Sequence, residues 1–113
     1  MNTVQEYTIE IYTTADGKLP YAQWLSTIKD QTTVDRIELR LYRIRQGNLG
    51  DCKDLKGGIY ELRLFFGPGY RIYFSKEGNT IILLLAGGTK RTQSRDIQRA
   101  REYYQDYLER KNG

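Results

Sequence analysis

Two neighbouring segments of the sequence carry the residue types that bind a phosphodiester. Glu61 and Arg63 alternate with apolar residues in the first segment, and Arg71 and Tyr73 do so in the second. Arginine offers phosphate a planar, permanently charged fork, and an aromatic ring gives an unstacked base a platform. The alternative is a plain exposed sheet face, on which Glu61 and Arg63 screen each other for less than about 1 kcal/mol.

The alternation predicts strands over 59–66 and 70–75, joined by the turn 67–69. Directly paired residues of an antiparallel hairpin share a face, and a turn with an odd number of residues places the two apolar sets together. The four polar residues then lie together on the other face of the sheet, away from the core formed with the helices predicted earlier in the chain.

The remaining elements must position this hairpin. The sequence predicts a strand over 7–13, a helix over 20–28, a second helix from about 33 to 46, a buried strand over 80–86 and a last helix from 93 to about 110. The order is therefore β-α-α-β-β-β-α. We expect an α+β fold, with a helical hairpin packed on the sheet and a helix at the C-terminal end.

A basic turn follows the buried strand. Gly87 and Gly88 let the chain leave the strand and allow another backbone to approach, and the next residues deliver Lys90 and Arg91 to the rim of the charged face. The alternative for this basic pair is a turn that caps the last helix.

The composition narrows the chemistry. The 113 residues contain no histidine and one cysteine, Cys52, so the commonest acid-base group is missing and no thiolate metal site can form. We therefore expect no catalytic metal and no cofactor. The length predicts a single domain over 1–113, and the lone cysteine, with no apolar leader or membrane span, predicts a cytoplasmic protein.

The charge is unevenly distributed. The formal net charge is +4, with eight basic and three acidic residues between 53 and 95, whereas 1–50 carry six of each. A basic surface of this kind suits an anionic partner such as RNA. A solvated basic surface without a partner is the alternative.

Three stretches occur in an ordered pattern. They are Leu-Lys-Gly-Gly-Ile-Tyr-Glu-Leu-Arg over 55–63, Gly-Tyr-Arg-Ile-Tyr-Phe over 69–74, and Leu-Leu-Ala-Gly-Gly-Thr-Lys over 84–90, followed by Gln93, Asp96, Ile97 and Ala100. In order and spacing they resemble the RelE/ParE toxin superfamily, and more closely its HigB-like, phage-derived addiction module killer branch. The resemblance covers nearly the whole chain.

The resemblance implies helices packed against a mostly antiparallel, twisted sheet. It also implies the toxin of a type II toxin-antitoxin system, an endoribonuclease that cleaves mRNA on the ribosome and inhibits translation. Such relatives use no metal, because the 2′-hydroxyl of the RNA attacks the adjacent phosphate and leaves a 2′,3′-cyclic phosphate. The implied partners are the ribosome, mRNA and a cognate helix-turn-helix antitoxin, with no membrane.

The resemblance also implies roles for individual residues. Arg71 would bind the scissile phosphate, with Arg63 as a second phosphate or backbone contact. Lys90 and Arg91 would steady the pentacovalent intermediate or protonate the leaving oxygen. Glu61 would act as a general base or, alternatively, orient Arg63 or Arg71 through a salt bridge.

Three further residues have open assignments. Lys53 and Lys56 hold RNA or lie in a solvated loop, and Tyr73 stacks on a base or simply covers the sheet. The late histidine of one RelE-like group is absent, and Ile97 stands where RelE itself has a late tyrosine. The general acid and base are therefore not identified by the resemblance.

Two other functions remain open. A ParE-like protein would inhibit DNA gyrase without cutting RNA, but the basic set Arg63, Arg71 and Lys90 counts against that reading. A degenerate toxin would bind only its antitoxin.

Overall fold

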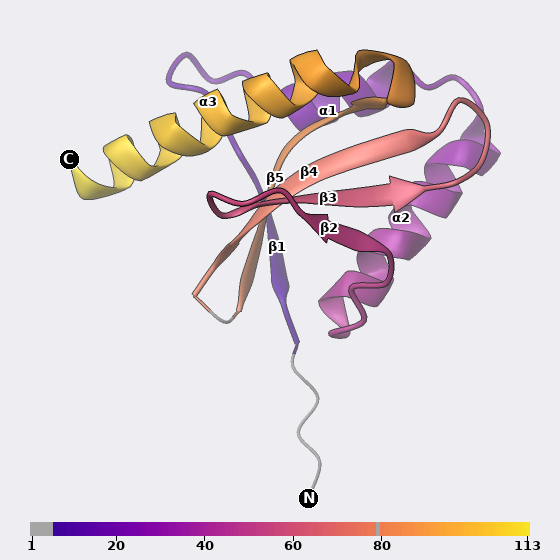
Figure 1. Ribbon diagram of the computed structural model, residues 1–113, viewed down its shortest axis with the longest axis horizontal. Coiled ribbons are helices and arrows are strands. Elements are labelled where there is room, and N and C mark those ends of the chain that lie inside the picture. The colour runs from indigo at the N-terminus through magenta and orange to yellow at the C-terminus, as the bar shows by residue number, and fades with distance from the viewer. Residues whose placement is uncertain (1–5, 79) are drawn as a thin grey trace, which may run out of the picture.

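The computed structural model describes residues 6–78 and 80–113. The elements are β1 (Thr8–Ile11), α1 (Pro20–Ser26), α2 (Gln31–Arg45), β2 (Cys52–Asp54), β3 (Ile59–Leu64), β4 (Tyr70–Glu77), β5 (Ile81–Thr89), the short 3₁₀ helix η1 (Lys90–Thr92) and α3 (Gln93–Asn112). The strands form one sheet in the order β1-β5-β4-β3-β2, parallel between β1 and β5 and antiparallel at the other pairs (Figure 1). This is the α+β class that the sequence predicts.

The order of elements differs from the prediction by one strand. The short strand β2 pairs antiparallel with β3, so the observed order is β-α-α-β-β-β-β-α. A strand of three residues, two of them charged, shows too little alternation to be told from a loop, and its pairing with β3 is what creates it. The other predicted elements are present, with ends that differ by a few residues.

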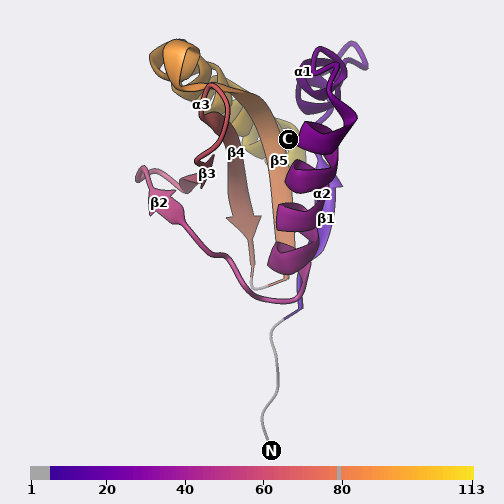
Figure 2. The same cartoon turned by 90° about the vertical axis from the view of Figure 1, so that its right-hand side faces the viewer.

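Helices α1 and α2 cover one face of the sheet (Figure 2). The core on this side consists of Tyr21, Ile37, Ile44, Leu62, Leu64, Ile72, Phe74, Ile82 and Leu84. In the β3–β4 hairpin, Leu62 pairs with Ile72 and Tyr60 with Phe74, so the apolar sets share this face. The apolar sets share a face, as predicted, but the predicted register is wrong: a turn over 67–69 would pair Phe66 with Tyr70, whereas Leu64 pairs with Tyr70 and the loop runs over 65–69.

Helix α3 crosses the opposite face, on which the alternation of β3 and β4 places the charged residues (Figure 2). Beneath it lies a second core of Tyr12, Ile59, Tyr73, Leu83, Leu85, Ala86 and Ala100. A β-bulge shifts the register of β4 and β5 between Tyr73 and Phe74. Bulges increase local twist and re-aim side chains, and this one lies beside the charged residues.

Gly87 and Gly88 lie inside β5, and this corrects the expectation that they release the chain from the strand. A Cβ on Gly87 would overlap the Trp24 ring of α1, and one on Gly88 would overlap the Asp96 carboxylate of α3. The glycines therefore let two helices pack closely against the two faces of one strand end.

The last helix begins at Gln93, as predicted, and ends at Asn112. Its N-terminal turn is preceded by a capping box in which Thr89 and Thr92 satisfy each other's backbone and side-chain groups. No helix in the described part of the chain is long and apolar enough to cross a membrane.

Candidate functional site

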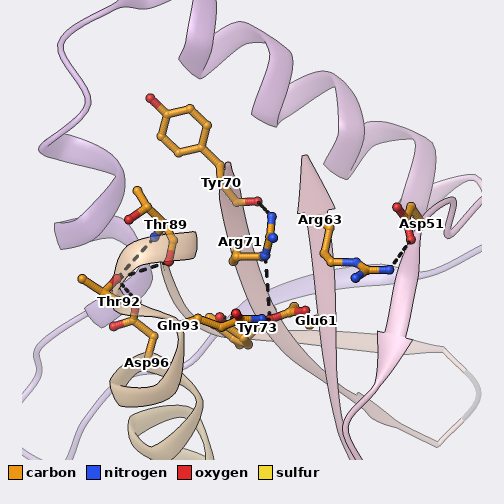
Figure 3. Close-up of polar contacts among 10 residues, drawn as sticks. All are labelled: Asp51, Glu61, Arg63, Tyr70, Arg71, Tyr73, Thr89, Thr92, Gln93 and Asp96. Atoms are coloured by element: carbon orange, nitrogen blue, oxygen red, sulfur yellow. Dashed lines mark hydrogen bonds and ion pairs between the residues drawn. The ribbon is translucent and has the colours of Figure 1, made fainter. Parts of the chain in front are cut away.

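Side chains from β3, β4 and α3 meet at the N-terminal end of α3 (Figure 3). We call Glu61, Arg71, Tyr73 and Gln93 the Glu61 cluster. The strand register pairs Glu61 with Tyr73 and Arg63 with Arg71. These four strand residues therefore lie on one sheet face, as predicted. Arg71 Nε lies 4.0 Å from Glu61 Oε2, and Glu61 and Arg71 are only 0% and 5% exposed. The pair is thus a buried contact between opposite charges.

Two donors hold one carboxylate oxygen of Glu61. Tyr73 Oη donates to Glu61 Oε2 at 3.2 Å, and Gln93 Nε2 donates to the same atom at 2.6 Å. Burial, and then the negative charge of Glu61, raise the pKa of the Tyr73 hydroxyl well above its ordinary value, so it remains a neutral donor. Glu61 Oε1 has no hydrogen-bond partner among the described residues.

These positions correct two predicted roles. Tyr73 is fully buried, so the prediction that its ring stacks on a base is wrong, and the alternative that it covers the sheet agrees with the structure. Glu61 is equally buried and cannot meet a substrate in this conformation. The physical reason is α3, which covers this part of the face. The geometry supports the other reading of Glu61, in which it orients Arg71.

Arg71 has unused hydrogen-bonding capacity. Its Nη1 donates a long bond of 3.4 Å to the Tyr70 carbonyl, and its buried Nε has no hydrogen-bond partner in the described part of the chain. Buried donors are almost always satisfied, so an exception calls for an explanation. This Nε faces Glu61 Oε2 at 4.0 Å, so an anion would bind Arg71 through its Nη groups.

Arg63 lies directly opposite Arg71 across the hairpin. Its Nη2 donates to Asp51 Oδ1 at 3.2 Å, while its Nε also lacks a partner among the described residues. Like charges directly opposite each other on a sheet destabilise it. A phosphate between the two guanidinium groups would remove that repulsion, so the arrangement favours anion binding.

Lys90 borders this pair from η1. Its backbone N–H donates to the Gly69 carbonyl at 2.8 Å, which ties η1 to the β3–β4 loop. A Cβ on Gly69 would lie 3.4 Å from Lys90 Cβ and 3.6 Å from Arg71 Nη1, so Lys90 and Arg71 flank the same glycine. Lys90 and the next residue, Arg91, are exposed. Neither side chain makes an ion pair or a hydrogen bond with another described residue.

The two predicted RNA-binding lysines lie in different places. Lys53 on β2 pairs with Glu61 on β3, so it lies on the same sheet face, exposed at the edge. Lys56 lies in the loop before β3, at the opposite end of that strand from Arg63. Its ammonium is 3.8 Å from Asp54 and its carbonyl accepts from Arg101. The structure therefore brings Lys53 toward the cluster and leaves Lys56 apart from it.

Two residues of the site were not predicted. Gln93 enters the ordered pattern only as a helix position, and its contact with Glu61 depends on where α3 packs. Phe65 follows β3 and is 69% exposed, with its ring centroid 5.5 Å from Arg63 Cζ and 5.7 Å from Arg71 Cζ. The sequence did hold a signal for Phe65, because it is an apolar residue at a position where the alternation expects a polar one.

The fold and the site define an α+β protein in which adjacent antiparallel strands hold two arginines beside a buried carboxylate. No protein-family model matches the chain. A protein of Haemophilus influenzae, described as an uncharacterized protein, is 40% identical over 94 residues, which make up 83% of this chain and 91% of that protein. The chain therefore belongs to the same family as the H. influenzae protein.

Proposed function

We propose that the protein is a RelE/ParE-superfamily toxin of the HigB-like branch, which cleaves mRNA on the ribosome without a metal. The observation that carries the proposal is the adjacent pair Arg63 and Arg71, each with a buried Nε that lacks a hydrogen-bond partner among the described residues. A phosphodiester is a suitable ligand, because its non-bridging oxygens accept two hydrogen bonds from a guanidinium fork. The mostly antiparallel sheet covered by helices supports the resemblance.

In the proposed reaction, the 2′-hydroxyl oxygen forms a bond to the adjacent phosphorus while the bond from phosphorus to the 5′-oxygen breaks. The products are a 2′,3′-cyclic phosphate and a 5′-hydroxyl. Negative charge grows on the non-bridging oxygens, where Arg71 and Arg63 stabilise it. The 5′-oxygen gains a proton, and Lys90, exposed at the rim of the site, is our candidate donor.

The contacts of Glu61 give it a positioning role in this mechanism. Its Oε2 accepts from Tyr73 and Gln93 and lies 4.0 Å from Arg71 Nε, so residues of β4 and α3 fix the carboxylate that faces the arginine. A fixed charge beside Arg71 limits the orientations of the guanidinium before substrate arrives. Such preorganisation is a main source of electrostatic catalysis.

The proposal also includes a cognate antitoxin that binds the protein, and the cytoplasm as its site of action.

The direct test is cleavage of mRNA in a purified translation system, with the cut ends mapped by primer extension. We expect Arg71→Ala to slow cleavage about 10²- to 10³-fold, the cost of removing one group that stabilises developing charge. Arg71→Lys should also fail, because lysine keeps the charge but lacks the fork. Arg110→Ala is the matched control, since Arg110 pairs with Asp106 far along α3.

Circular dichroism of each variant would show that the fold is retained. Cleavage by Arg71→Ala at the rate of the control would show that the site is elsewhere. An inactive wild-type protein would exclude the nuclease, and DNA gyrase supercoiling would then be the assay for the ParE-like alternative.

A further inference from the structure

A groove of about 270 Å³ lies between α2 and the β3–β4 loop. It is lined by Arg36, Leu39, Arg40, Arg43, Leu64, Phe65 and Phe66. We call it the α2 groove. Its lining is basic and apolar and contains no acidic residue among the described ones. It continues from the site, because Phe65 belongs to the groove and also lies over Arg63 and Arg71.

Three arginines of α2 give the groove its charge. Arg36, Arg40 and Arg43 follow at spacings of four and three residues, so they lie on one side of the helix. Arg40 has a structural role, since its Nη1 donates to the Arg63 carbonyl at 3.2 Å. Arg36 Cζ lies 4.7 Å from the Phe66 ring centroid, and Arg43 is exposed. Arg36 and Arg43 therefore have guanidinium donors available to a ligand.

Phe65 is the most exposed of the large hydrophobic residues in the described chain, at 69%. Exposing a phenyl ring forgoes a burial free energy of about 1.5 to 3 kcal/mol. Arg63 and Arg71 lie near the ring on one side, and the arginines of α2 line the groove on the other. Aromatic rings placed among cations are typical of surfaces that bind single-stranded nucleic acid, because bases stack on the rings while the cations neutralise phosphates.

We propose that the α2 groove binds the single-stranded RNA that extends from the phosphate held at Arg71. In this arrangement one base stacks on Phe65, and the phosphates beyond it lie against Arg36 and Arg43. The identity of the ligand as RNA rests on the proposed function. Binding in the α2 groove is nevertheless independent of cleavage, because RNA should bind there whether or not the strand is cut.

The test uses a fluorescein-labelled 2′-O-methyl RNA oligonucleotide, which has no free 2′-hydroxyl and cannot be cleaved, with binding measured by fluorescence anisotropy. We expect Phe65→Ala to raise the Kd about 5- to 100-fold, the value of one base stacked on an aromatic ring. Phe65→Trp should retain binding. Arg43→Gln should weaken binding and reduce the slope of log Kd against log salt by about 1.

Helix α2 itself supplies matched controls. Tyr42 and Arg45 are exposed residues of the same helix that do not line the groove. Tyr42→Ala and Arg45→Gln remove the same kinds of side chain and should leave both the Kd and the salt slope unchanged. Circular dichroism should show that all variants retain the fold.

The outcomes separate this inference from the proposed function. Binding that depends on Phe65 and Arg43 would support the groove even if the wild-type protein cleaves no mRNA. Cleavage by wild type, with Kd and KM in Phe65→Ala and Arg43→Gln equal to those of the controls, would overturn the groove and leave the nuclease. No binding by wild type would also overturn it. Equally strong competition by polyglutamate would assign the groove to an acidic protein partner instead.

Discussion

Two polar clusters lie under α3 on the same face of the sheet, and they differ in how well they are satisfied. In the Glu61 cluster, Oε1 of Glu61 has no partner within the described chain. In the second, which we call the Glu77 cluster, Tyr104 Oη donates to Glu77 Oε2 at 2.8 Å and Lys111 Nζ lies 3.6 Å from Glu77 Oε1. Each oxygen of Glu77 therefore has its own partner.

The difference separates a site from a structural contact. An unsatisfied buried polar group costs about 1 to 3 kcal/mol, so a fold that served stability alone would remove it. The Glu77 cluster shows that this face can satisfy a carboxylate completely. The open hydrogen-bonding capacity around Arg71 and Glu61 is therefore the feature that we connect with a ligand.

The largest expected difference between the Glu61 and Glu77 clusters is in the rate of mRNA cleavage. Glu61→Gln removes the negative charge that faces Arg71, and we expect the rate to fall about 10- to 100-fold, equivalent to one hydrogen bond or ion contact with a charged group. Glu77→Gln should leave the rate unchanged. Single-turnover cleavage as a function of pH is the measurement.

The pH profile distinguishes positioning from general-base catalysis. If Glu61 orients Arg71, Glu61→Gln lowers the rate by the same factor at every pH. If it were a general base, the acidic limb of the profile would disappear and the loss would reach about 10²- to 10⁴-fold. Stability in urea should also respond to both changes. Glu77→Gln should cost about 1 to 2 kcal/mol, because it removes a charge that two partners satisfy, and Glu61→Gln should cost about 3 to 5 kcal/mol, because it leaves the buried guanidinium of Arg71 without its counter-charge.

The sequence predicted the hairpin and the residues that share each of its faces, because both follow from local rules. Alternation places Leu62 and Ile72 on the core face and Arg63 and Arg71 on the other. The direct pairing of Arg63 with Arg71 was not predicted, because the loop takes five residues, 65–69, and shifts the pairing by two residues from the predicted turn. The short strand β2 was not predicted, because its three residues show no alternation of apolar and polar side chains and only the pairing with β3 makes the segment a strand.

What could not be predicted is the face on which α3 packs. Its apolar stripe, with Ala100 at the centre, shows that the helix is buried on one side but not against which surface. That placement buries Glu61 and Tyr73 and brings Gln93 to within 2.6 Å of the carboxylate. The residue roles that proved wrong are those that depend on this long-range contact.

A smaller effect appears at alkaline pH and tests the Glu77 cluster. Burial first, and then the hydrogen bond to Glu77, raise the pKa of Tyr104 from 10.0 to about 12. The unfolded chain loses this proton near pH 10 while the folded chain keeps it, so the stabilisation is fully present below pH 10 and is lost between about 10 and 12. We expect urea unfolding to show a shallower alkaline decline in Tyr104→Phe than in wild type.

Tyr12 offers an independent check of this effect. Burial and a hydrogen bond to Asp106 raise its pKa from 10.0 to about 12, so Tyr12→Phe should also flatten the decline. An alkaline decline that is equal in both variants and in wild type would show that these hydroxyls titrate alike in the folded and unfolded chain.

The smallest effect concerns Asp51, a partly exposed carboxylate that pairs with Arg63. It lies 3.2 Å from Arg63 Nη2, and its side chain is 42% exposed. Exposed pairs of this kind contribute about 0 to 1 kcal/mol, so Asp51→Asn should hardly change stability. The variant does release Arg63 from a competing acceptor, and we expect RNA affinity measured by anisotropy to rise about twofold at low salt, with the gain disappearing as salt screens the charges. A fall in affinity would mean that Asp51 holds Arg63 in its binding orientation, and the carboxylate would then belong with Glu61 as part of the site.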